Sequence, residues 1–95
     1  MPHFFVKLIP PRPAFHLDIT PEEREVMGRH AAYWRDQMQQ AKVAVFGPVF
    51  DPAGVYGMAI LHAETEAEAR ALASADPALA IQRFELYPMQ AVLPT

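Results

Sequence analysis

Two Thr-x-x-Glu motifs constrain the fold of this chain more than any other feature, because each one predicts the start of a helix. Residues 20–23 read TPEE, which matches an N-terminal capping box with proline at the first helical position. Residues 65–68 read TEAE and repeat the box. We therefore predict one helix from residue 20 to about residue 40, and a shorter one that ends near Ser74.

Segments rich in β-branched and aromatic residues flank both helices and predict strands. A proline-rich loop is expected at 10–19, and Asp51–Gly54 has the composition of a type I turn. The resulting β-α-β-β-α-β order is that of a ferredoxin-like α+β domain, with an antiparallel sheet and both helices on one face. At 95 residues, the chain suits a single domain over 1–95. The predicted strands are 3–9, 42–50 (interrupted at Gly47-Pro48), 55–62 and 81–87.

The first three strands are largely apolar on both of their alternating faces. In the first strand, for example, Phe4 and Val6 alternate with Phe5 and Ile9. A sheet with one face in water should instead alternate apolar with polar residues. Two helices can cover only one face, so we predict a homodimer in which a second copy covers the other around a two-fold axis.

Composition excludes several functional classes. The chain has no cysteine, so a disulfide or a thiolate metal site is excluded. The net charge is -3 and the lysines and arginines are scattered, which argues against nucleic-acid binding. No apolar stretch approaches the ~20 residues that span a bilayer. We expect a cytoplasmic protein with no membrane segment, no metal site and no bound cofactor, since a glycine-rich phosphate loop is also absent.

The order and spacing of several short features resemble the YCII-related (YciI-like) family over nearly the whole chain. These features are His30 in RHAAYW, FGPVFDPAG around Gly47-Pro48, an Ala/Glu-rich second helix, Asp76-Pro77, and a last strand that runs into YPM. The resemblance implies a ferredoxin-like subunit that dimerises into an α+β barrel. It also implies an active site around His30 and Asp76. Dehydrochlorination of a chlorinated hydroxyquinol is one activity associated with the family.

His30 and Asp76 are the predicted catalytic residues. The helical spacing turns His30 toward the sheet, where an imidazole can act as general base or acid. The alternative is a half-buried histidine that binds a backbone carbonyl. Asp76 would orient the imidazole, as the carboxylate does in other His-Asp pairs. Its alternative is the turn chemistry that ends a helix, where Asp-Pro is frequent.

The other candidate residues would bind a small molecule. Arg12, on the proline-rich loop, could pair with an anionic group, although a solvated loop arginine is the simpler interpretation. Four aromatic residues could line an apolar pocket between the first helix and the sheet, or they could belong to the core. These four residues are Tyr33, Trp34, Phe46 and Tyr56, and Phe15 on the proline-rich loop is a further candidate for binding the ligand.

The leading hypothesis is a small cofactor-independent enzyme. It would carry out elimination or isomerisation on a small cyclic or aromatic anionic compound, with His30 as base, Asp76 as its orienter and Arg12 as anion anchor. The alternative is a non-catalytic module that binds a small ligand on the same dimeric scaffold.

Overall fold

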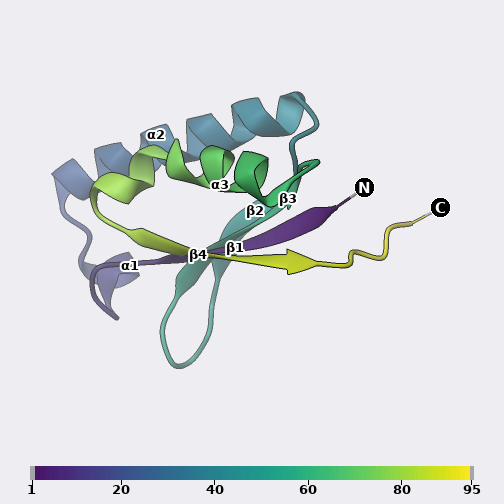
Figure 1. Cartoon of the computed structure of the whole chain (residues 1–95). Helices are drawn as coiled ribbons and strands as arrows, with labels where there is room; N and C mark the ends of the chain where they lie inside the picture. The colour runs from purple at the N-terminus through teal and green to yellow at the C-terminus, as the bar shows by residue number, and fades with distance from the viewer. Residues whose placement is uncertain (1, 95) are drawn as a thin grey trace.

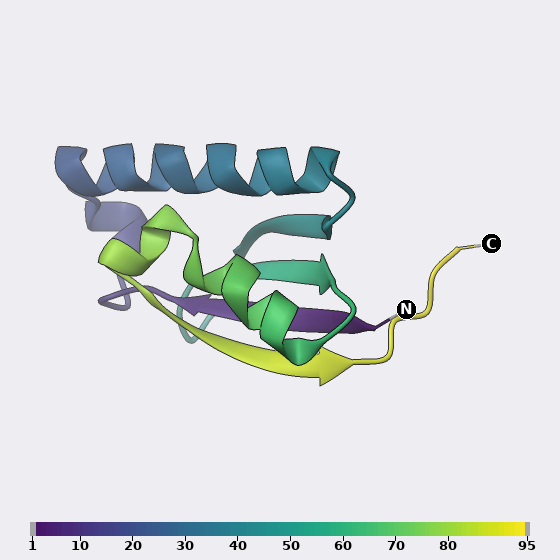
Figure 2. The same cartoon turned by 45° about the horizontal axis from the view of Figure 1, so that its top comes forward.

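The computed structural model describes residues 2–94, and it confirms the predicted ferredoxin-like α+β arrangement. Four antiparallel strands form one sheet in the order β2-β3-β1-β4, and the two longer helices, α2 and α3, lie on one face of it (Figures 1 and 2). The strands are β1 (His3–Ile9), β2 (Val43–Val49), β3 (Tyr56–His62) and β4 (Arg83–Met89). The helices are α1 (Phe15–Asp18), α2 (Pro21–Gln39), α3 (Glu66–Ser74) and the short 3₁₀ helix η1 (Pro77–Ala80).

Both predicted capping threonines accept a hydrogen bond from the first turn of their helix. At α2 the box is complete: Glu23 N–H donates to Thr20 Oγ1 (3.1 Å), and Thr20 N–H donates to Glu23 Oε1 (2.9 Å). At α3 the hydroxyl of Thr65 accepts from Glu68 N–H, but the Glu68 carboxylate accepts from the N–H of Glu64 instead. At α3 the glutamate side chain therefore binds the N–H of the residue before the N-cap, instead of the N–H of the N-cap residue itself.

Some element boundaries differ from the prediction. The loop at 10–19 contains the one-turn helix α1, and the chain after Asp76 forms η1 before it enters β4. Strand β4 spans 83–89 rather than 81–87 and passes through Pro88, while β2 continues through Gly47-Pro48. Both prolines lie in edge strands, where a residue without an N–H is tolerated.

The core lies between the sheet and the two longer helices. In the antiparallel register, Val6 of β1 faces Ala59 of β3 on one side and Leu86 of β4 on the other. Alternate residues of β1 point toward the helices and are buried there with Trp34 of α2. The main buried side chains of this core are Phe4, Val6, Leu8, Trp34, Val43, Ala59 and Leu61.

The other face of the sheet is, within residues 2–94, covered by no helix (Figure 1). It carries the charged residues Lys7, Glu85 and Arg83 beside a row of apolar and aromatic residues. The register aligns Val45, Ile60, Phe5 and Tyr87 in one row across all four strands. Val45 and Tyr87 are each 49% exposed. We call this surface the open face. No helix among the described residues is long and apolar enough to cross a membrane.

Candidate active site

The structure brings His30 and Asp76 into contact, although 46 residues separate them in the chain. His30 lies on α2, and Asp76 is the N-cap residue of η1. The imidazole Nδ1 lies 2.8 Å from Oδ2 and 2.9 Å from Oδ1 of Asp76, so it is shared between the two carboxylate oxygens. The Asp76 side chain is fully buried, and 14% of the His30 side chain is exposed.

Each oxygen of the Asp76 carboxylate has one further donor. Trp34 Nε1–H donates to Oδ2 (2.7 Å), and the backbone N–H of Ala78 donates to Oδ1 (2.8 Å). Because an ionised carboxylate only accepts hydrogen bonds, we assign the His30 proton to Nδ1. The other ring nitrogen, Nε2, is then unprotonated in the neutral imidazole and can take a proton.

His30 forms part of the wall of a cavity of about 320 Å³ between α1, α2 and the sheet. The lining is mostly apolar and aromatic, as in pockets that bind small molecules. Apart from the imidazoles of His16 and His30, the lining formed by residues 2–94 contains no charged or titratable group but the phenol of Tyr56. Its largest apolar side chains are those of Leu8, Phe15, Ile19, Met27, Phe46 and Tyr56.

Three of the five predicted aromatic residues lie in the wall of this cavity with His30: Phe15, Phe46 and Tyr56. Tyr33 and Trp34 do not line it, so the prediction that they form a ligand-binding wall is wrong: Trp34 lies in the core and Tyr33 packs against the core. The Trp34 side chain is fully buried beneath the pair, because its position one helical turn after His30 directs the indole N–H to Asp76.

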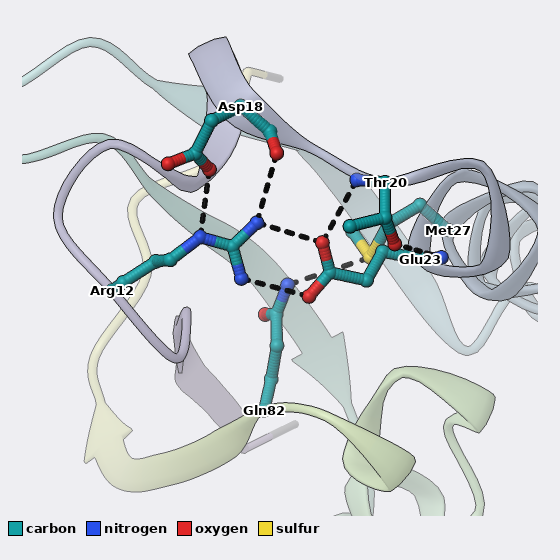
Figure 3. Close-up of polar contacts among 6 residues, drawn as sticks. All are labelled: Arg12, Asp18, Thr20, Glu23, Met27 and Gln82. Carbon is teal, nitrogen blue, oxygen red and sulfur yellow. Dashed lines mark hydrogen bonds and ion pairs between the residues drawn. The ribbon is translucent and has the colours of Figure 1, made fainter.

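Arg12 also lies outside the residues that line the cavity, and it is held by two acidic side chains (Figure 3). Its Nη1 and Nη2 bind the two oxygens of Glu23 (2.8 and 2.7 Å), and its Nε binds Asp18 Oδ1 (2.7 Å). Hydrogen bonds from Arg12, and then the N–H of Thr20, lower the pKa of Glu23 to about 2. Arg12 therefore ties α1 to α2, and this geometry does not offer the guanidinium to a ligand in the cavity.

Other residues of the site were missed by the sequence analysis. Met27 lines the cavity one turn before His30, and the i, i+3 spacing on one helix face could have indicated it. Gln82 lines the cavity too, and its amide lies 3.4 Å from Met27 Sδ (Figure 3). No local pattern indicated Gln82, because η1 brings it there. Among residues 2–94, no three histidine, aspartate or glutamate side chains form a group that could hold a metal ion.

Comparisons with known proteins agree with this fold. The family model of the YCII-related domain matches residues 3–91 of the sequence. A solved structure with a similar fold is 5-chloro-2-hydroxyhydroquinone dehydrochlorinase (TftG) from Burkholderia phenoliruptrix AC1100, in complex with 2,5-dihydroxybenzoquinone. It superposes with a TM-score of 0.59 over 92% of this chain and 93% of its own, at 16% sequence identity. None of the curated proteins compared matches the sequence.

Proposed function

The chain belongs to the YCII-related family, and on the basis of its His30 cavity we propose that it is a small enzyme that transfers a proton on a cyclic or aromatic compound. One observation carries this proposal. A histidine in the wall of an apolar cavity has its Nδ1 bound to a buried carboxylate, which leaves Nε2 as the proton acceptor.

The proposed step begins when Nε2 of His30 takes a proton from an acidic C–H or O–H group of the ligand. In an elimination, the electron pair left by the proton forms a double bond and the leaving group departs with its own pair. In an isomerisation, the same proton returns to another atom of the ligand. The Asp76 carboxylate stabilises the imidazolium that forms when Nε2 takes the proton.

The cavity supports a small ligand. Its volume of about 320 Å³ is near the lower end of the range for small-molecule pockets. The anionic character that we expected from Arg12 is not part of the proposal, because Arg12 is bound to Glu23 and Asp18. The activity of the structural neighbour makes chlorinated, hydroxylated aromatic compounds the first class to test.

We propose further that the protein works as a homodimer through the open face. Phe5, Ile60 and Val45 form a continuous apolar row there, and a second copy related by a two-fold axis would remove it from water. The dimer would also stabilise the fold, because a domain this small buries only roughly two-thirds of the surface that its unfolded chain exposes.

Chloride release from 5-chloro-2-hydroxyhydroquinone, measured without oxygen, tests the catalytic proposal on wild type and His30→Gln. Loss of the base should reduce kcat by about a hundredfold to ten-thousandfold. Binding, followed by calorimetry, should persist. His16→Gln is the comparison variant, because it removes the other cavity imidazole, which has no carboxylate partner among the described residues, and its kcat should fall less than that of His30→Gln. If His30→Gln releases chloride at the wild-type rate, His30 is not the base. If wild type binds the compound without turnover, the non-catalytic binding module becomes the better interpretation.

A further inference from the structure

Trp34 and His30 both direct a ring N–H at the same carboxylate. They lie one turn apart on α2, so their side chains emerge from one face of the helix. The indole Nε1 lies 2.7 Å from Oδ2 of Asp76, and the imidazole Nδ1 lies 2.8 Å from that same oxygen. The Trp34 side chain is fully buried and cannot contact a ligand from its present position.

We infer that Trp34 is a positioning residue of the proposed enzyme: its indole N–H holds the Asp76 carboxylate in the orientation that keeps the His30 proton on Nδ1. The effect of Trp34 on catalysis rests on the proposed function. The effect of Trp34 on the His30 tautomer, through Asp76, can be measured without a substrate.

The arrangement of donors gives the physical reason. A carboxylate can rotate about its Cβ–Cγ bond, and rotation would move both oxygens relative to the imidazole. Here the Trp34 indole holds Oδ2 and the Ala78 N–H holds Oδ1, so any rotation breaks two buried hydrogen bonds together. With both oxygens held, the position between them is filled by the Nδ1–H of His30.

Trp34 is itself held rigidly, which a positioning residue requires. Its ring packs against the ring of Tyr33 in an edge-to-face contact, with centroids 5.0 Å apart. The same Tyr33 donates from its hydroxyl to the carbonyl of Leu72 on α3 (2.7 Å). Tyr33→Phe keeps the ring that packs on Trp34 and removes only this hydroxyl, whose hydrogen bond does not involve Asp76, so it supplies the matched control.

The experiment removes the indole N–H and reads the His30 tautomer by long-range ¹H–¹⁵N NMR of the imidazole. Trp34 is the only tryptophan, so biosynthetic incorporation of 3-benzothienylalanine replaces this residue alone, with sulfur in place of N–H and nearly the same shape. Trp34→Phe is the genetically encoded counterpart. We expect the ratio of Nδ1–H to Nε2–H tautomer of neutral His30 to fall by about tenfold, the effect of one ordinary hydrogen bond.

Tyr33→Phe should leave that ratio as in wild type, even if it lowers the melting temperature. An unchanged ratio in the folded benzothienylalanine protein would overturn the inference, and so would an equal change in Tyr33→Phe. The result is separate from the fate of the proposed function. Loss of activity in His30→Gln tests the base, whereas the tautomer ratio tests only whether Trp34 acts on the base through Asp76.

Discussion

Arg12 and Glu23 form a two-pronged ion pair that joins the loop after β1 to the first turn of α2, with Nη1–Oε2 and Nη2–Oε1 distances of 2.8 and 2.7 Å (Figure 3). The same Glu23 carboxylate accepts the N–H of Thr20 and so completes the capping box. One side chain therefore starts the helix that carries His30 and also holds α1, whose Phe15 lines the cavity.

The Arg12–Glu23 pair predicts a pH-dependent contribution to stability. The pKa of Glu23 is lowered to about 2, so its stabilising effect is complete above the ordinary glutamate pKa and is lost as the pH falls toward 2. Arg12→Gln should therefore melt at a lower temperature than wild type from pH 5 to 7, and the difference should shrink between about pH 4.3 and pH 2. Calorimetric melting at several pH values measures it. Arg24→Gln, which removes an exposed arginine without an ion pair among the described residues, should show no such convergence.

Thr20→Ala should destabilise the protein by about 1 kcal/mol, because it removes the acceptor for the N–H of Glu23 at the start of α2. Thr20→Ser keeps the hydroxyl and should restore most of that loss. Urea unfolding followed by circular dichroism measures both. Equal destabilisation by alanine and serine would mean that the threonine methyl group, rather than the cap, carries the effect.

Alanine substitutions at two glycines of neighbouring strands should change the free energy of unfolding differently. A Cβ at Gly57 would lie 3.3 Å from Cβ of the buried Leu8, so Gly57→Ala should cost about 1 kcal/mol and narrow the cavity that both residues line. A Cβ at Gly47 meets nothing within 4 Å, and Gly47→Ala should be neutral or stabilising by about 0.5 kcal/mol. Denaturant midpoints compare the two variants, and similar midpoints would contradict the close approach at Leu8.

The proposed dimer predicts that a charge on the open face separates the subunits. Wild type should have about twice the chain mass of 10.6 kDa in light scattering, and Ile60→Lys should approach the mass of one chain. The reason is that the ammonium group would lose its water in the interface without a partner. Ala67→Lys, at an exposed position of α3, should leave the mass unchanged. A wild-type mass of a single chain at micromolar concentration would contradict the proposed dimer.

The sequence by itself determined the order of elements and the starts of the helices. Capping is local, since Thr20 and Glu23 lie within one turn, and strand alternation has a period of two residues, so both can be read from neighbours in the chain. The boundaries of β4 and the helices α1 and η1 were missed, because short helices and edge-strand prolines depend on what packs beside them.

Tertiary structure alone decided which side chains meet. His30 and Asp76 were paired in the sequence only through a family resemblance, and their contact depends on the path of the chain across the sheet and along α3. The roles of Trp34 and Arg12 changed for the same reason: a helical position defines a direction for the indole but not the carboxylate it reaches, and a loop arginine binds whichever carboxylates the fold brings near. Periodicity is a property of adjacent residues, whereas a site is made by residues that only the packed chain brings together.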